Sequence, residues 1–168
     1  MDPNLIVYYS SSAGYLAGKN EIHAILTKLG DQKSQQELLV PGIIAVTTVF
    51  KSRDVVEEIR DLMANDPESV KFTVKWVPAD YWCDATIEGI KTTVKEEIKD
   101  LIVADDQYII EILPHRTALK PEQILEAIKP WLKGKLNPEH PQKILRIELF
   151  DTRATVTLLK PKDIFSKE

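Results

Sequence analysis

The sequence predicts an α+β protein built from two lobes. Short runs rich in β-branched and aromatic residues alternate with longer stretches in which apolar residues recur every three or four positions. The first pattern is typical of strands and the second of amphipathic helices. The two patterns follow one order up to residue 77 and another order after it, and Val77-Pro78-Ala79-Asp80 is the best joint between them.

The first lobe, residues 1–77, is predicted to contain four strands and two helices. Glycine and proline residues separate the periodic runs and mark where each element ends. The expected elements are a strand at 5–9, a helix ending at Gly30, strands at 36–40 and 43–50 joined by a Pro41-Gly42 turn, a helix at about 53–65 and a strand at 70–77. This β-α-β-β-α-β order is the ferredoxin-like order.

The second lobe, residues 78–168, is predicted to have the order α-β-α-β-β. Its helices are marked by apolar residues at helical spacing, and Pro121 occupies the favoured first position of the second helix. The expected elements are a helix at about 83–103, a strand at 108–113, a helix from about 121, and strands at 144–150 and 154–160 joined by a turn at 151–153.

The charge of the chain is slightly acidic overall but unevenly distributed. There are 22 Lys and Arg residues against 26 Asp and Glu residues, a net charge of −4, which argues against a protein that coats nucleic acid indiscriminately. Residues 115–168, however, carry 11 basic and 7 acidic residues. Any contact with RNA is therefore expected to be local.

The sequence lacks the patterns of a membrane span, a metal site or a cofactor site. No apolar run approaches the roughly 20 residues that cross a bilayer, and MDPNLIVYY lacks the features of a signal peptide, so we expect a cytoplasmic protein without a membrane partner. Cys83 is the single cysteine, and the three histidines have no metal-ligand spacing. The SSSAG stretch at 10–14 lacks the spaced glycines of a phosphate loop. We predict neither a metal site nor a cofactor.

Two features allow an enzyme as an alternative. Cys83 is placed at a predicted helix N-terminus, where a thiol can become a nucleophile, although a buried structural role is favoured because no nearby histidine pairs with it. The ferredoxin-like order also occurs in acylphosphatase-type hydrolases, but the loop after the first strand has no arginine. Tyr81-Trp82 could stack on bases or serve packing, and packing is favoured.

The stretch ILPHRTALKPEQILEAI (112–128) contains the strongest candidate site. His115, Arg116 and Thr117 are predicted to lie in a short loop between a strand and a helix, where helix N–H groups and the positive dipole end favour an anion. No nucleophile, metal ligand or partner base lies nearby in the sequence. Because guanidinium binds phosphate oxygens bidentately, the loop is interpreted as a phosphate grip with His115 as a flanking contact.

Three segments between residues 75 and 165 resemble THUMP domains, the small α/β modules of tRNA-modifying proteins. KWVPADYWCDATIEGIKTTVKEEI (75–98) is similar to the beginning of the domain, EILPHRT (111–117) to a strand and its arginine-containing loop, and LNPEHPQKILRIELFDTRATVTLLKPKDIF (136–165) to the closing hairpin. THUMP domains usually follow an N-terminal ferredoxin-like domain. The resemblance therefore implies a fold for nearly the whole chain.

The resemblance also implies a function. THUMP enzymes carry a further catalytic domain, whereas this chain resembles stand-alone THUMP proteins, which bind tRNA for the RNA cytidine acetyltransferase that forms N4-acetylcytidine. It implies a non-catalytic adaptor that presents the acceptor arm of tRNA. Carried over by position, the THUMP pattern assigns RNA contacts to Lys75, Arg116 and Lys160.

The complete set of predicted RNA-binding residues joins these positions to basic and polar side chains of the second lobe. The set is Lys75, Lys91, Lys95, His115, Arg116, Thr117, Lys120, Lys129, Lys133, Lys160 and Lys162. The expected partners are tRNA and either the RNA acetyltransferase or another tRNA-modifying enzyme, for thiolation or methylation. A small hydrolase and a protein-interaction module without an RNA role stay open as alternatives.

Overall fold

The computed structural model describes residues 1–167, which form two compact units. One unit comprises residues 1–79 and the C-terminal segment from Lys162, and the other comprises residues 80–161. The structure differs from the predicted division because the chain returns to the first unit at its end. There the short strand β10 (Phe165–Ser166) pairs with β4, which places Phe165 beside Trp76.

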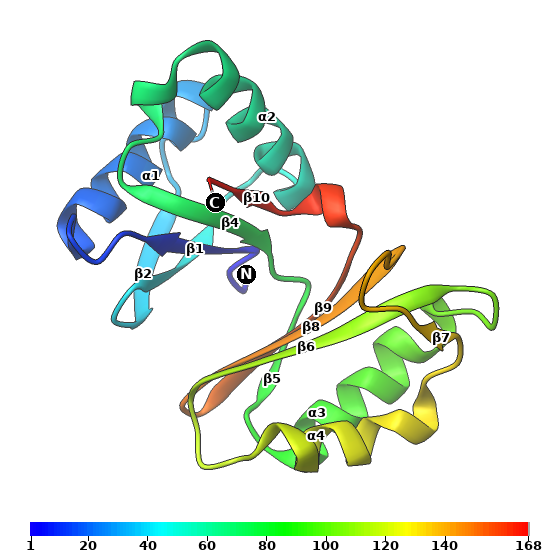
Figure 1. Cartoon of the computed structure of the whole chain (residues 1–168). Helices are drawn as coiled ribbons and strands as arrows, with labels where there is room; N and C mark the ends of the chain where they lie inside the picture. The colour runs from blue at the N-terminus through cyan, green and yellow to red at the C-terminus, as the bar shows by residue number, and fades with distance from the viewer. Residues whose placement is uncertain (168) are drawn as a thin grey trace. The chain divides into compact units, whose positions relative to one another are not determined.

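The first unit has the predicted order of strands and helices (Figure 1). Its elements are β1 (Leu5–Tyr9), α1 (Tyr15–Leu29), β2 (Gln35–Val40), β3 (Ile43–Thr47), α2 (Ser52–Asn65), a short 3₁₀ turn (Pro67–Ser69) and β4 (Thr73–Pro78). The strands form an antiparallel sheet in the order β10-β4-β1-β3-β2. The core between the sheet and the two helices includes the fully buried Trp76.

Two elements of this unit are shorter than predicted because side chains take their backbone partners. β3 ends at Thr47, where Thr48 N–H donates to the Asn4 side chain at 3.1 Å. At the start of β4 the Glu21 carboxylate accepts three successive N–H groups, at 2.5 Å from Lys71, 2.9 Å from Phe72 and 2.6 Å from Thr73, the first residue of the strand. Local polar contacts thus compete with the sheet for the same donors.

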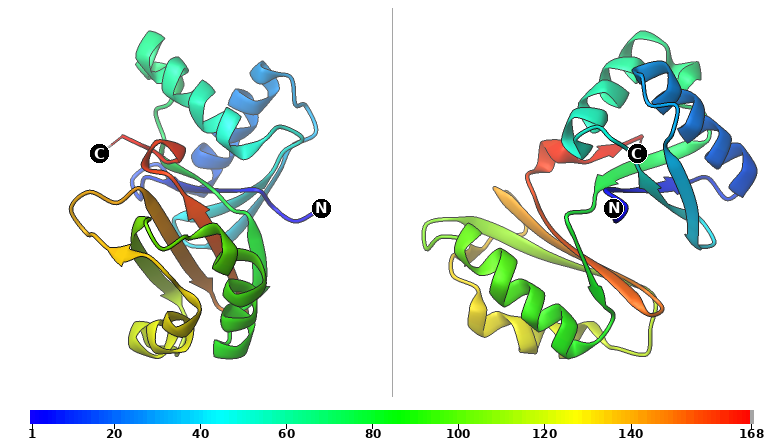
Figure 2. Two further views of the ribbon diagram at one scale, coloured as in Figure 1. Left: turned by 90° about the vertical axis from the view of Figure 1, so that its right-hand side faces the viewer. Right: turned by 180° about the vertical axis from the view of Figure 1, so that it is seen from behind.

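The second unit places its helices side by side on one face of its own five-stranded sheet (Figure 2). Its elements are β5 (Tyr81–Asp84), α3 (Ile87–Thr93) continued by a π turn (Val94–Ile98) and a 3₁₀ turn (Lys99–Leu101), β6 (Gln107–Arg116), α4 (Pro121–Ile128) with a 3₁₀ turn (Lys129–Trp131), β7 (Lys135–Leu136), β8 (Lys143–Phe150) and β9 (Arg153–Leu159). The strand order is β5-β9-β8-β6-β7, and β6 runs parallel to both neighbours. The predicted order is confirmed, with β5 and β7 added.

The predicted helix at 83–103 is wrong at its beginning. Residues 81–84 form β5, which pairs with β9 and puts Cys83 on a strand opposite Ala154. The helix starts only after Thr86, whose hydroxyl accepts the Gly89 N–H at 3.0 Å as an N-cap. Aromatic residues favour a strand, and a threonine cap sets the first helical turn, so the boundary follows from local chemistry.

A buried carboxylate joins the end of α1 to the end of β3. Asp31 is 3% exposed and accepts hydrogen bonds from the Thr48 hydroxyl at 2.6 Å and from the Lys33 and Val49 N–H groups at 3.0 and 3.1 Å. Burial opposes ionisation, but these hydrogen bonds outweigh it and hold the pKa of Asp31 below its ordinary value of 3.8. The carboxylate is therefore a stabilising element of the first unit.

We expect Asp31→Asn to lower the free energy of unfolding by about 1–3 kcal/mol at pH 7, because charge-assisted hydrogen bonds are lost. A lowered folded-state pKa contributes stability that is fully present above the unfolded pKa and is lost as the pH falls through the folded pKa. The difference between the two proteins should thus shrink as the pH falls below about 4. Urea denaturation at several pH values measures this, with the exposed Asp2→Asn as control; a difference that stays constant with pH contradicts it.

Candidate nucleic-acid interface

Strand β6 is longer than predicted and carries His115 and Arg116, which therefore do not lie in a loop. It pairs with β8 from Tyr108 beside Lys143 to Arg116 beside Phe150. The register shifts between Pro114 and Arg116. The strand presents Arg116 as an exposed side chain at its end.

The start of α4 offers fewer free N–H groups than the sequence suggested. Thr117 lies four residues before Pro121, and its hydroxyl oxygen accepts the Leu119 N–H at 3.1 Å in a local turn. Pro121 has no N–H, and the Gln123 N–H donates to the Lys120 carbonyl at 3.0 Å. An anion at this position would depend on the exposed side chains of Arg116 and Lys120 more than on the helix backbone.

The turn between β8 and β9 supports the end of β6. Asp151 N–H donates to the Arg116 carbonyl at 2.6 Å, and Ala85 N–H donates to the Thr152 carbonyl at 3.0 Å. The segments that precede α3 and α4 therefore both contact the turn between β8 and β9. We call the group Arg116, Thr117 and Lys120 the Arg116 corner. Because the acidic Asp151 also lies here, phosphate binding would depend on directed contacts and not on net charge.

His115 is engaged inside the unit. Its Nε2 lies 2.9 Å from Glu148 Oε1, and its ring stacks on Phe150 with 5.3 Å between centroids. The side chain of His115 is 19% exposed and that of Glu148 only 2%. The structure thus gives His115 an internal hydrogen-bond partner, which the sequence interpretation as a flanking contact did not include.

Glu148 belongs to a row of paired charges that the sequence analysis missed. Arg146 Nε lies 3.2 Å from Glu148 Oε2, and Arg146 Nη1 lies 2.8 Å from Glu111 Oε2. Arg146 and Glu148 are both buried. They alternate on β8 with Leu145, Ile147 and Leu149, which pack into the core beneath the helices. The alternation in ILRIELF is the sequence signal for this row, since every second residue of a strand points to the same face.

A second basic group surrounds Trp131. The ammonium groups of Lys95 and Lys99 lie 4.9 and 5.8 Å from the centre of its ring. The exposed Lys129 and Lys133 flank Trp131 in the sequence after α4. We call Lys95, Lys99, Lys129 and Lys133 the Trp131 cluster. Trp131 and Lys99 were not among the predicted site residues, although the spacing of Lys95 and Lys99 on one helical face indicates such a grouping.

The other predicted basic residues are distributed more widely. Lys91 Nζ lies 2.9 Å from Glu88 Oε1 in a pair on α3, and Lys160 is exposed after β9. Lys75 and Lys162 belong to the first unit, where the Lys75 ammonium lies 5.6 Å from the centre of the Tyr8 ring and the Lys162 carbonyl accepts a hydrogen bond from Arg60 at 2.8 Å. The predicted residues therefore do not form one patch within either unit.

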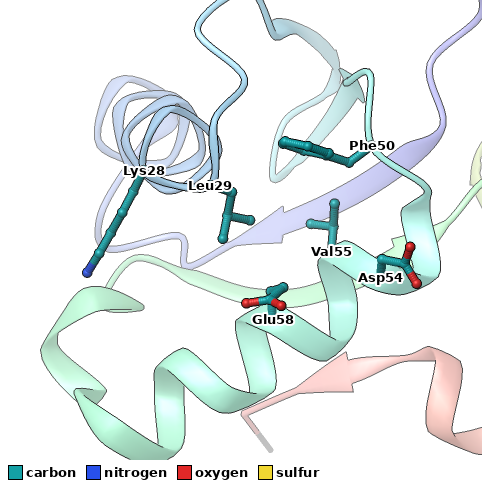
Figure 3. Close-up of a pocket in the computed structure, with 6 residues that line it drawn as sticks. All are labelled: Lys28, Leu29, Phe50, Asp54, Val55 and Glu58. Carbon is teal, nitrogen blue, oxygen red and sulfur yellow. The ribbon is translucent and has the colours of Figure 1, made fainter.

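The first unit has a hollow between α1 and α2, drawn in Figure 3. Its volume is about 340 Å³, and the apolar Leu29, Phe50 and Val55 line it together with Lys28 and the carboxylates of Asp54 and Glu58. The two carboxylates would repel a phosphate, and the lining contains no nucleophile and no arginine. This hollow does not support the acylphosphatase-like alternative.

Residues 1–167 contain no group of three or more His, Cys, Asp or Glu side chains placed to hold a metal ion. The described helices are also all too short or too polar to cross a bilayer.

This chain is similar to known proteins in its structure. No family model and no curated protein matched the sequence. Among solved structures, PH1313 from Pyrococcus horikoshii Ot3 is similar over 98% of this chain with a TM-score of 0.61 and 12% identity. A 4-thiouridine synthetase solved in complex with RNA and ATP matches 99% of the chain with a TM-score of 0.52 and 10% identity. TrmN from Thermus thermophilus matches 94% with a TM-score of 0.57 and 5% identity.

The fold is THUMP-like. The three likenesses cover both units of the chain and agree with the fold that the sequence resemblance implied. The chain spans only 55%, 42% and 46% of the lengths of these proteins. At such low identities the comparison concerns the fold alone.

Cys83 does not have the environment of an activated nucleophile. It is half-buried on β5 against the core of the second unit, away from the helix N-terminus where the sequence placed it. Burial raises the pKa of the Cys83 thiol, Asp84 raises it further, and a hydrogen bond with Thr93 only partly offsets them. The thiolate that would attack a substrate is thereby disfavoured.

We expect Cys83 to react with a disulfide reagent at pH 8 at least about tenfold more slowly in the folded protein than in urea, because its pKa is raised and its side chain is half-buried. The folded-state rate should continue to increase with pH above 9, the ordinary thiol value. Absorbance of the released thiolate measures both rates. A folded-state rate equal to or above that in urea would revive a catalytic role for Cys83.

Proposed function

We propose that this protein is a non-catalytic adaptor that binds the acceptor arm of tRNA and presents it to a separate modifying enzyme. The observation that carries the proposal is the Arg116 corner, where two exposed cations lie at the junction of three loops. Support comes from the whole-chain likeness to a 4-thiouridine synthetase that was solved with RNA.

Recognition by shape suits the distribution of charge. The deep, narrow groove of A-form RNA hides the base edges, so phosphates and 2′-hydroxyls carry the contacts. At the Arg116 corner, the guanidinium of Arg116 would bind the phosphate backbone of the RNA bidentately. The Trp131 cluster would supply further phosphate contacts. A chain with a net charge of −4 would then bind RNA through a few directed contacts and with a modest salt dependence.

The modification that the partner enzyme makes follows from two likenesses. The sequence resemblance to stand-alone THUMP proteins favours N4-acetylcytidine, formed by an RNA cytidine acetyltransferase acting in trans. The likeness to a 4-thiouridine synthetase equally favours a thiolation pathway, and methylation stays an alternative. In each case our proposal assigns RNA positioning to this chain and the chemistry to its partner.

Alanine at both Arg116 and Lys120 should weaken tRNA binding by about tenfold at low salt and reduce the slope of log affinity against log salt by about two, because two phosphate contacts are lost. Filter binding or fluorescence anisotropy at several salt concentrations measures both quantities. The matched control is Lys28→Ala with Lys33→Ala, which removes the same charge from exposed positions of the first unit.

The same assay separates the two basic groups of the second unit. If tRNA binding is unchanged in the Arg116 and Lys120 variant but is lost with Lys95→Ala and Lys99→Ala, the site lies at the Trp131 cluster. Equal binding by every variant and the control would contradict RNA recognition by either group.

The partner reaction can be identified from the nucleosides of tRNA. Addition of this protein to a cognate RNA cytidine acetyltransferase should raise N4-acetylcytidine in tRNA from near background, because the adaptor supplies substrate binding that the enzyme lacks. Mass spectrometry of digested tRNA measures N4-acetylcytidine, 4-thiouridine and methylated nucleosides together. A rise in 4-thiouridine or a methylated nucleoside with its own enzyme would assign the other pathway, and product formed by this chain alone would contradict the adaptor proposal.

A further inference from the structure

One side of β6 is left open for most of its length. Strand β8 covers the other side from Tyr108 to Arg116, whereas β7 pairs only with Gln107 and Tyr108 (Figure 1). No other strand in the described part of the chain pairs with β6 beyond that point. We call the open side of residues 109–113 the β6 edge.

The β6 edge presents backbone groups in the arrangement that a further strand needs. Asn137 N–H donates to the Tyr108 carbonyl at 2.9 Å, so the backbone groups of Tyr108 point toward β7. Because the backbone N–H and C=O groups of alternate residues point to the same side of a strand, those of Ile110 and Ile112 face the open edge. An unpaired row of this kind is a template for strand addition.

An apolar groove lies along the same edge. It has a volume of about 360 Å³ and is lined by Ile109, Ile110, Leu125, Lys129, Leu136 and Pro138. Leu136, the last residue of β7, is 57% exposed. The groove thus begins where β7 ends and offers aliphatic contacts to the side chains of a strand that extends the line of β7.

We propose that the β6 edge binds an extended segment of a partner protein, which adds a strand to the sheet of the second unit. The charges define the chemistry of the segment. Lys129 is the single charged residue in the groove lining, the exposed Lys133 precedes β7, and the exposed Lys135 is the first residue of β7. The segment would place aliphatic side chains in the groove at alternate positions and acidic side chains toward these lysines.

A second copy of this chain fits the edge less well. Antiparallel pairing about a two-fold axis would bring the Arg116 end of one β6 to the Gln107 end of the other, where Lys135 is paired. Like charges would then meet at both ends of the interface. RNA also fits poorly, because aliphatic walls provide no stacking surface and nucleic acid cannot continue a backbone ladder.

The β6 edge is a different site from the Arg116 corner, and strand addition to it does not depend on RNA binding. Lys129 is shared, because the sequence analysis assigned it to RNA and the structure places it in the groove. Leu136 is therefore the better residue for the test, since its substitution leaves every predicted RNA-binding residue in place.

Random peptides of about nine residues are displayed and selected for binding to the immobilised full chain. A strand extends by ~3.3 Å per residue, so a peptide of this length spans the edge. We expect enriched peptides to alternate aliphatic and acidic residues. A synthetic peptide of the enriched sequence should bind Leu136→Glu and Lys129→Glu at least about tenfold more weakly, because each change places a carboxylate beside the acidic segment. Lys33→Glu, an exposed reversal in the first unit, should leave binding unchanged, and circular dichroism confirms that each variant is folded.

Amide exchange distinguishes strand addition from simple filling of the groove. The peptide should slow the exchange of the Ile110 and Ile112 N–H groups, and a proline at its centre should abolish binding, because it removes a donor from the ladder. Absence of enrichment, or binding that is indifferent to Leu136→Glu, overturns the proposal. A dimer, or tRNA binding, that disappears in Leu136→Glu would assign the edge to a second copy or to RNA and would overturn it as well.

Discussion

The parallel pairing of β6 with β8 is the constraint on which the second unit depends. Parallel neighbours cannot be joined by a tight turn, so the chain must cross over, and α4 with the segment after it forms that crossover. The crossover requires a sharp exit from the end of β6. Arg116 and Lys120 lie on either side of that exit, and the turn at Asp151 holds it in place. The candidate site is therefore a consequence of topology.

The same pairing aligns the charged side chains of the sheet. It places Glu111 opposite Arg146, and the hairpin partner of Glu148 is Thr155. Buried charges are costly unless they are paired and hydrogen-bonded, and removal of one partner leaves the other uncompensated. Arg146 satisfies this condition by contacting two carboxylates, and Glu148 is shared between Arg146 and His115. His115, whose neighbours in the sequence had suggested a role in RNA contact or catalysis, is thus hydrogen-bonded to this row of paired charges.

Sequence periodicity predicted most of the elements because both units keep their apolar residues on one face. The strand at 5–9, the helix ending before Gly30 and the hairpin across Pro41-Gly42 have local signals and were confirmed. The two missed strands β5 and β10 share one cause. β5 and β10 are short strands whose pairing partners, β9 and β4, lie about 70 to 90 residues away in the chain, so no local pattern shows that they will pair. The helix predicted at 83–103 began too early because residues 83 and 84 belong to β5.

The sequence by itself determined the two-unit α+β order, the local basic surplus after residue 114 and the presence of Arg116 beside a helix start, because these depend on periodicity and composition. Only the tertiary structure decided that His115 is bound by Glu148, that Lys95 and Lys99 share Trp131, and that one side of β6 stays open. Each of these depends on residues far apart in the chain meeting across a sheet or between helices. Their register is set by packing and long-range pairing, which single-sequence patterns do not encode.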